Sequence, residues 1–279
     1  MRKHLLGLDH TVLRVADLDR AAEDFANMGF TISPRGVHSL GTQNHCLVFG
    51  FDYLELLWVP PGVAAPFYAQ TAGGSEGLTG LALKSDNAAE LRATWDKAGL
   101  HPEPLLSFSR PVEVEPDIAQ DARFSTVPLP GERTPGGRAF ACQHFTPQLV
   151  WRPGYRRHRN HVTGINKLVI RSDDPQAAAT LWARVFDVPP HPIPGGFAIN
   201  TGAAPIVILD AGALAGQLPG VTLPGDGNPS IFAAVYLSTP EVRGAAATLG
   251  AGGFRPVALA DGAIAVGADQ AHGVAIIFK

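Results

Sequence analysis

The hydrophobic and polar positions of the chain repeat one pattern four times. In each copy, an apolar run typical of a β-strand leads through a short polar step into a segment whose apolar residues recur every three or four positions, the spacing of an amphipathic helix. The copies span 8–30, 77–100, 164–188 and 230–254, and the first stripe ends at Gly29, a helix stop. The four stripes are Leu18, Ala21, Ala22 and Phe25; Ala88, Leu91, Trp95 and Ala98; Ala178, Leu181, Trp182 and Val185; and Val242, Ala245, Ala246 and Leu249.

Short strand-like runs broken by Gly and Pro follow each helix, such as "FTISPR", "HCLVFGF" and "YLELLWV" after the first. Each copy is therefore predicted to be a β-α-β-β-β unit. A single unit has one apolar sheet face but too little core to fold alone, so the units must pair. We expect an α+β fold in which four units form two curved, eight-stranded half-barrels with the helices outside.

Two stretches interrupt this pattern. Residues 152–164, "RPGYRRHRNHVTG", are basic and nearly free of aliphatic side chains, as in a solvated linker, although they could also guard a site entrance for an anionic ligand. We therefore expect domains 1–153 and 164–279, joined by a linker over 154–163. The region from Ser109 to Gly137 is rich in Pro, Asp and Glu, and we expect an irregular loop that is either a lid or a disordered decoration.

Composition narrows the choice of partners. With 46% apolar and 17% charged residues, the 279-residue chain can bury one large core or two. A net charge of −3 gives no electrostatic basis for binding nucleic acid or an anionic membrane. We expect a small-molecule substrate, and a monomer or homodimer.

The N-terminal sequence and the small number of cysteines favour a cytoplasmic location. Met1 to Gly7 has no apolar stretch of the kind found in a secretory signal, and no run approaches the roughly 20 apolar residues of a transmembrane helix. Two cysteines, Cys46 and Cys142, are too few for a disulfide framework. We expect them to be buried thiols in a reducing, cytoplasmic protein.

Glu55 is the one charged residue in the apolar run from Tyr53 to Val59. A buried carboxylate without compensation costs several kcal/mol or takes up a proton. A structural ion pair with an arginine such as Arg14 or Arg138 is one way to compensate it.

The repeated unit, with "LDHTVLRVADLDRAAEDF" near the start of the chain, resembles the vicinal oxygen chelate superfamily, which includes glyoxalase I, the extradiol dioxygenases and the bleomycin-resistance proteins. More narrowly, H-x-x-G-T-x-N at 38–44, "YLEL" at 53–56 and "HFTPQLVWRP" at 144–153 resemble the glyoxalase-like domain family. The superfamily resemblance covers nearly the whole chain, and the narrower one covers its first 153 residues.

This resemblance implies a divalent metal on the concave sheet, held by the first and last strands of each unit in a pair. In unit one these positions are His10 and Glu55, where the cation would compensate the carboxylate and Glu55 could also act as a general base. His10 could instead be a hydrogen-bonded core histidine.

In unit two the first-strand position falls on Thr79 or Gly80, and neither is a good ligand. We expect His144 in the last strand to supply the missing imidazole, with Gln148 as its rival. Together with His10 and Glu55, His144 would form a 2-His-1-carboxylate set for Zn²⁺, Fe²⁺, Mn²⁺ or Ni²⁺.

Gln148 and three other positions are candidates for substrate binding. His38 and Asn44 match the narrower motif, and His45 lies next to Asn44 on a strand whose alternate residues face opposite sides, so the sequence leaves open which side is the pocket wall. The second half offers only Asn166, Ala233 and Asp210 at the corresponding positions, and we expect it to be scaffold or interface.

Two functions fit these observations. The first is a divalent-metal enzyme of glyoxalase or dioxygenase type, whose metal would bind two neighbouring substrate oxygens. The second is a metal-free protein that binds or sequesters a small molecule, as the bleomycin-resistance proteins do. The absence of a unit-two histidine, and Gln148 where a glutamate is expected, favour the second.

Overall fold

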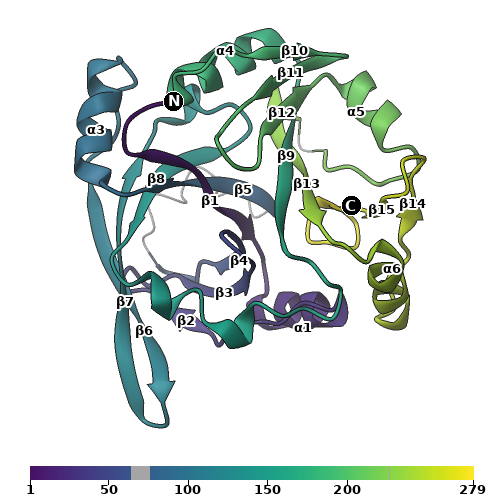
Figure 1. Ribbon diagram of the computed structural model, residues 1–279, viewed down its shortest axis with the longest axis horizontal. Coiled ribbons are helices and arrows are strands. Elements are labelled where there is room, and N and C mark those ends of the chain that lie inside the picture. Colours follow the sequence, from purple (N-terminus) through teal and green to yellow (C-terminus); the bar gives the residue numbers. More distant parts are fainter. Residues whose placement is uncertain (64–75, 226) are drawn as a thin grey trace.

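Two eight-stranded sheets lie next to each other in a computed structural model that describes residues 1–63, 76–225 and 227–279 (Figure 1). The N-terminal sheet has the order β2-β3-β4-β1-β5-β8-β7-β6, and the C-terminal sheet has the order β10-β11-β12-β9-β13-β16-β15-β14. Helices cover the outside of both sheets (Figure 1). The predicted α+β fold of paired half-barrels is confirmed.

The N-terminal sheet consists of two β-α-β-β-β units. Unit one contains β1 (Leu5–Arg14), α1 (Leu18–Asn27), β2 (Gly36–Val37), β3 (Gln43–Val48) and β4 (Tyr53–Trp58). Unit two contains β5 (Gly77–Ser85), α3 (Ala88–Lys97), β6 (Leu106–Glu115), β7 (Ile118–Pro128), a 3-10 turn (Gly131–Arg133) and β8 (Arg138–His144).

Two further 3-10 turns (Pro147–Leu149 and Pro153–Tyr155) lead into the C-terminal sheet. Unit three contains β9 (Gly164–Ser172), α4 (Pro175–Phe186), β10 (His191–Ile193), β11 (Gly196–Ile199) and β12 (Ile206–Leu209), and α5 (Ala211–Gln217) follows it. Unit four contains β13 (Ser230–Ser238), α6 (Val242–Ala251), β14 (Val257–Ala258), β15 (Ile264–Val266) and β16 (Ala275–Phe278). None of the helices in the described part of the chain is long and apolar enough to cross a membrane.

The first strands of paired units form the centre of each sheet. β1 pairs antiparallel with β5, and β9 pairs antiparallel with β13. Each of these strands also pairs in parallel with the last strand of its own unit, as β1 does with β4. The helices start where the polar step predicts, because Asp17, Asn87 and Asp174 accept hydrogen bonds of 2.9–3.1 Å from backbone N–H groups three residues later.

One hydrophobic core joins the two halves, since buried residues from Leu5 to Phe278 belong to the same cluster. The indole of Trp95 donates to the carbonyl of Val185 at 3.2 Å, and the indole of Trp182 donates to the carbonyl of Pro135 at 2.9 Å. The helix stripes predicted from the sequence therefore pack against the partner half as well as against their own sheet.

The basic segment is exposed at Arg156, Arg157 and Arg159, but it is not solvated throughout. Asn160 is fully buried and donates to the carbonyl of Met28 at 3.0 Å. The ring of His158 is hydrogen-bonded at 3.0 Å to both the Thr31 N–H and the Val48 carbonyl. Polar side chains here satisfy backbone groups of unit one, a use that composition alone does not reveal.

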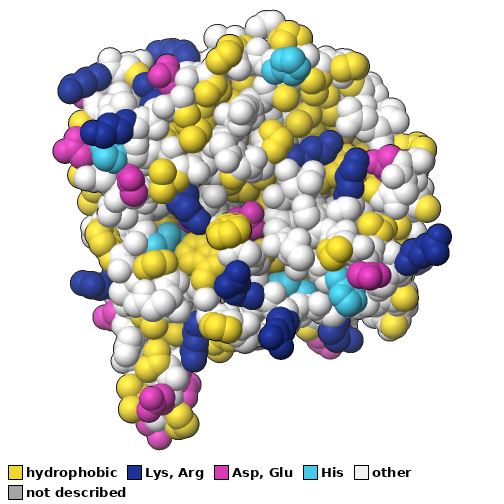
Figure 2. Space-filling model, viewed as in Figure 1, with side chains coloured by type: hydrophobic (Ala, Val, Ile, Leu, Met, Phe, Trp, Pro, Cys, Tyr) yellow, Lys and Arg dark blue, Asp and Glu magenta, His cyan; other side chains and the backbone are white. Residues whose placement is uncertain are grey.

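The expectation of an irregular Ser109–Gly137 loop is wrong, because β6 and β7 form a long antiparallel hairpin. Pro111 is tolerated since β6 is an edge strand of the sheet, and Asp117 has the positive φ of the turn. The end of the hairpin projects into solvent and carries acidic side chains (Figures 1 and 2). Its polar composition therefore reflects exposure and not disorder.

The inner end of this hairpin brings the two edges of the N-terminal sheet together. The Ser39 N–H, just after β2, donates to the Ser109 carbonyl at 2.8 Å, and the Ser109 N–H donates to the Ser39 hydroxyl at 3.2 Å. The sheet thus curls until its edge strands, β2 and β6, meet, and its concave face encloses a cavity.

Asp52 makes one junction between the halves dependent on pH. Its carboxylate accepts a 3.1 Å hydrogen bond from the Ile165 N–H at the start of the second half. Burial raises the pKa of Asp52 to about 7, against the opposing effects of this bond and of Lys84. Because the folded pKa is raised, the stability contribution is fully present below the ordinary pKa of 3.8 and is lost as pH rises through about 7.

We predict that Asp52→Asn, which keeps an oxygen acceptor, raises the free energy of unfolding at about pH 8 by on the order of 2 kcal/mol, and has a smaller effect at about pH 4. Urea unfolding at both pH values measures this difference. The matched control is Asp117→Asn at the exposed hairpin turn, which should change neither value. An equal effect of Asp52→Asn at both pH values would contradict the prediction.

Candidate functional site

The concave face of the N-terminal sheet encloses a narrow cavity of about 50 Å³. Aromatic side chains of Tyr53, Phe108, Phe124 and Phe140 form much of its wall. Its polar wall consists of His10, His38, Thr42, Asn44, Glu55, Arg110 and Thr126. Leu40 and Leu106, which are 41% and 36% exposed, lie at its mouth.

Glu55 faces this cavity from β4 and is 5% exposed. The side-chain amide of Asn44, on the neighbouring strand β3, donates to Glu55 Oε1 at 2.5 Å. His10 Nε2 lies 3.6 Å from Oε2, and His38 Nε2 lies 4.0 Å from Oε1. Among the described residues, neither arginine considered from the sequence pairs with this carboxylate, and Arg138 instead pairs with Glu103 at 3.6 Å.

A β-bulge turns two successive side chains of β1 into the same face. The β1–β5 register passes from Leu8 directly to His10, so Asp9 is an extra residue in the strand. As a result, Asp9 and His10 both lie on the concave side, where alternation alone would separate them.

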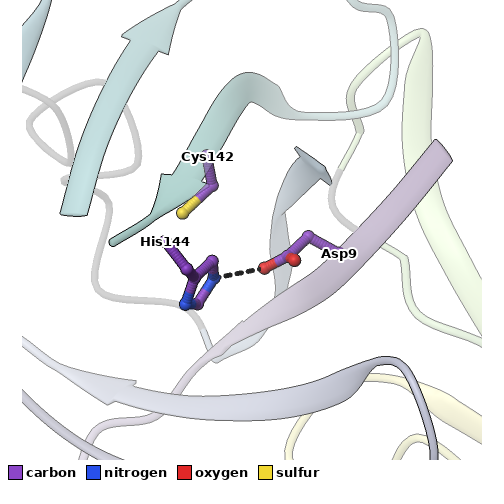
Figure 3. Close-up of side chains that lie close together, drawn as sticks. All are labelled: Asp9, Cys142 and His144. Atoms are coloured by element: carbon purple, nitrogen blue, oxygen red, sulfur yellow. Dashed lines mark hydrogen bonds and ion pairs between the residues drawn. The ribbon is translucent and has the colours of Figure 1, made fainter. Parts of the chain in front are cut away.

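Asp9 is fully buried between two histidines, His10 and His144. Figure 3 shows its hydrogen bond to His144. Its Oδ2 accepts hydrogen bonds of 2.8 Å from His10 Nδ1 and from His144 Nε2, and Lys84 Nζ lies 3.4 Å from Oδ1. Burial by itself raises the pKa of Asp9, but the charges and hydrogen bonds of His144 and His10 outweigh it and hold the pKa well below its usual value. The ionised carboxylate fixes the His10 tautomer, so Nε2 points toward Glu55.

His38 is held in the Gly-Thr turn that its motif predicts. Its Nδ1 is hydrogen-bonded to the Thr42 hydroxyl at 2.8 Å, and its backbone N–H donates to the Thr42 carbonyl at 2.9 Å. Burial lowers the pKa of His38 to about 4, with Glu55 opposing the shift and Arg110 and His10 adding to it. His38 is therefore neutral at physiological pH.

The structure divides the sequence-predicted residues among three places. His10, His38, Asn44 and Glu55 line the cavity. His144 and Gln148 line a separate depression of about 410 Å³, together with Lys84 and Trp151. His45 lies on the opposite face of β3, where its Nδ1 donates to the Ser33 carbonyl at 2.7 Å, so its predicted place in the pocket is wrong.

The expected metal set of His10, Glu55 and His144 does not converge. His144 turns to Asp9, beyond the Tyr53 ring that stacks on His10 at 4.2 Å. In the described part of the chain, one group of three side chains could hold a metal ion: Asp9, Cys142 and His144, whose ligand atoms lie within 4.8 Å of one another (Figure 3). Burial raises the pKa of the Cys142 thiol well above its usual value, so this thiol stays protonated without a metal.

Comparison with known proteins identifies the family. A family model described as a glyoxalase-like domain matches residues 8–186. The chain belongs to the glyoxalase-like domain family. A search of curated proteins finds no match.

Solved structures share the fold at low sequence identity. A hypothetical protein from Staphylococcus aureus has a TM-score of 0.71 at 12% identity, with 98% of each chain covered. A variant of 4-hydroxymandelate synthase from Streptomyces coelicolor has a TM-score of 0.56 at 16% identity, covering 90% of this chain and 76% of that one. A fusion of a xylose isomerase-like TIM barrel with 4-hydroxyphenylpyruvate dioxygenase has a TM-score of 0.57 at 10% identity, covering 100% and 49%.

Within this glyoxalase-like fold, the internal symmetry shows which residues replace the family's second pair of ligands. A bulge at Thr79 of β5 corresponds to the bulge at Asp9, so Gly80 corresponds to His10. In the parallel pairs, Val12 lies opposite Glu55 and Ala82 lies opposite Phe140, so Phe140 corresponds to Glu55. Neither Gly80 nor Phe140 carries a ligand atom, and the Phe140 ring lies 5.7 Å from the His10 ring. The four positions that the family implies therefore do not fit a metal.

The described residues of the second half contain no comparable set. Its bulges fall at Asn166 and Ala233, so Lys167 and Ala234 correspond to His10. By the same registers, Val207 and Ile277 correspond to Glu55. Asp210, the other candidate there, caps α5 by accepting from the Ala213 N–H at 2.7 Å.

Sequence reasoning missed Asp9 and Arg110. Asp9 was hidden because strand alternation places it opposite His10, and the bulge that reverses this is a property of strand pairing. Arg110 was hidden in the segment interpreted as a loop. Its place next to Pro111 in a run that alternates "VEVE" was the available signal for a strand.

We predict that Asp9→Asn lowers the free energy of unfolding by about 3 kcal/mol at neutral pH, because two buried imidazoles lose their shared anion. Since the folded pKa of Asp9 is lowered, its stabilisation is present above the ordinary pKa and is lost as pH falls below it. Denaturant unfolding should therefore show a gap between variant and wild type that narrows toward acid pH.

The matched control is Asp86→Asn, which removes a carboxylate that is 56% exposed and hydrogen-bonded to His4 at 2.8 Å. Its effect should stay below about 1 kcal/mol. A loss of equal size in both variants would show that burial between two histidines does not distinguish Asp9.

Proposed function

We propose that this protein binds a small, oxygen-bearing organic molecule in the N-terminal half-barrel, without a metal at the family's four ligand positions. The observation that carries the proposal is the replacement of the second ligand pair by Gly80 and Phe140. The space beside His10 is occupied by an aromatic ring, and the two remaining ligands are too few to hold an ion firmly.

The cavity has the composition of a small-molecule site, with apolar walls and a few convergent polar groups. Its mouth is lined by leucines that are partly exposed, which gives an apolar ligand an entrance. Ligand binding here requires these side chains to move apart, because the cavity is about 50 Å³, enough for only a few waters.

His10 and Glu55 determine the hydrogen-bonding character of the ligand. His10 Nδ1 donates to Asp9, so the cavity-side Nε2 accepts hydrogen bonds when the ring is neutral and donates them when the ring is protonated. Glu55 is also an acceptor, 3.6 Å away. A ligand hydroxyl can donate to either group, and the pair can also take up and return a proton from a bound ligand.

A second candidate function is a divalent-metal enzyme, favoured by the Asp9–Cys142–His144 group. These are nitrogen, oxygen and sulfur ligands of the kind that Zn²⁺ and other transition metals accept. His144 Nδ1 is buried and has no hydrogen-bond partner among the described residues. Against this candidate, Asp9 Oδ2 already accepts from two imidazoles.

Elemental analysis of protein purified without chelator separates the two candidates. We predict a metal content far below one ion per chain, and no gain in melting temperature from saturating Zn²⁺, Fe²⁺, Mn²⁺ or Ni²⁺. The positive control is Phe140→Glu, which places a carboxylate opposite the His10–Glu55 pair and should make the melting temperature respond to these ions. One tightly held ion in the wild type would favour the metal candidate.

Ligand-observed NMR with a panel of small aromatic alcohols, acids and amides tests binding directly. We predict hits whose affinity falls about fivefold or more in Glu55→Gln, because a charged acceptor is lost. The control His191→Gln, on the exposed strand β10 of the second half, should leave affinity unchanged. A panel without hits, or hits indifferent to Glu55→Gln, would contradict the proposal.

A further inference from the structure

Arg110 is a buried arginine that has no counter-ion among the described residues. It lies on β6, is 6% exposed, and lines the same cavity as His10 and Glu55. Within residues 1–63, 76–225 and 227–279, no carboxylate approaches its guanidinium within 4.0 Å and no hydrogen bond to it is formed. A guanidinium remains charged at all physiological pH values, so its positive charge persists in the cavity.

The other buried arginine of this half behaves differently. Arg138 is 7% exposed and pairs with Glu103 at 3.6 Å. Burying a charge without such a partner costs several kcal/mol. The exception at Arg110 therefore calls for an anion that the described part of the chain does not supply.

Packing, and not an ion pair, holds Arg110 in place. Gly36 on β2 lies over its side chain so closely that an added Cβ would come within 2.9 Å of Arg110 Cδ and 3.0 Å of Nη1. The preceding residue, Ser109, is fixed to Ser39 by two hydrogen bonds. The guanidinium is thus positioned in advance while its N–H donors stay available, which lowers the entropic cost of binding a ligand.

The opposite charges of the cavity stay apart. Glu55 is satisfied by Asn44 at 2.5 Å and has His10 and His38 beside it, while Arg110 lies beyond ion-pair distance. The positive charge of Arg110 nevertheless acts inside the cavity. Burial is the main cause of the lowered His38 pKa, and the charge of Arg110 lowers that pKa further. A ligand spanning the cavity meets N–H donors on one side and acceptors on the other.

Building on the proposed function, we infer that the ligand is a small hydroxycarboxylic acid with an apolar or aromatic body. Arg110 binds its carboxylate through two parallel N–H···O bonds, the geometry in which a guanidinium fits a carboxylate best. The hydroxyl donates to His10 Nε2 or Glu55, and the body packs against Phe108, Phe124 and Phe140.

A carboxylate fits this site better than a phosphate. Arg110 is the one arginine or lysine on the described cavity lining, and His38 is neutral. A phosphate dianion needs more donors than one guanidinium supplies, and Glu55 in the same cavity would repel the second charge.

The test compares mandelate with mandelamide, and benzoate with benzamide, by ligand-observed NMR and calorimetry at low ionic strength. In the wild type, each acid should bind at least about tenfold more tightly than its amide, and mandelate should exceed benzoate through its hydroxyl. Arg110→Met should abolish the preference for the acids and leave amide binding within about twofold. Arg110→Lys should retain part of the preference, because it keeps the charge but loses the two-pronged geometry.

Arg138→Met is the matched control, because it removes a buried arginine that lines no part of this cavity. It should lower the melting temperature and leave the acid preference intact. Arg110→Met should have the opposite stability effect and melt at or above the wild-type temperature, since it removes an unpaired buried charge. This second readout shows that the variant is folded.

The outcomes separate this inference from the proposed function. If acids and amides bind equally well in a Glu55-dependent manner, the proposed function stands and the carboxylate inference fails. If the acid preference survives Arg110→Met, the carboxylate inference also fails. It fails as well if none of the four compounds binds. A broad panel without hits removes the proposed function itself.

Discussion

A buried carboxylate at a β-bulge organises the site. Asp9 is placed on the concave face only because β1 carries one residue more than β5 at this point. Once there, it must be compensated, and His10 and His144 both donate to the same oxygen. This arrangement orients His10 toward Glu55 and draws His144 away from it. The geometry of the cavity and the failure of the expected metal set thus have one cause.

The bulge in the first strand is common to all four units, whereas the carboxylate of Asp9 is found in unit one. Corresponding bulges occur at Asp9, Thr79, Asn166 and Ala233, so all four units bend their first strand in the same way. A bulge increases local twist and helps a sheet curl. The bulge therefore shapes each half-barrel whichever residue occupies it. Where Asp9 and His10 occupy these positions, the curl also presents acid–base groups to a cavity.

The sequence was sufficient for the architecture because the architecture depends on local patterns. The helix stripes, their capping residues and the stop at Gly29 define the four units, and pairing follows from the need to bury a sheet face. The same alternation placed Glu55 on a buried strand but left the side of Asn44 and His45 open. Only the register with β4 decides it, because Cys46 lies opposite Glu55 and Asn44 shares its face.

Details that depend on contacts between distant parts of the chain could not be predicted from the sequence. The direction of His144 depends on Asp9, which lies 135 positions away. The basic segment is buried at His158 and Asn160 because backbone groups of unit one need partners there. The Pro-rich segment is a hairpin because its strand lies at a sheet edge, where a missing N–H does no harm.

The cavity holds a cation and an anion that do not neutralise each other. Glu55 is stabilised by the Asn44 amide and by flanking imidazoles, and Arg110 is fixed by its packing beneath Gly36. A direct pair between them would stabilise the empty protein but would use up the donors and acceptors that a ligand needs. Keeping them apart costs folding free energy, and a ligand with complementary ends recovers it on binding. Of all the features of the site, the separation of Glu55 and Arg110 is therefore the one that is hardest to explain by a structural role alone.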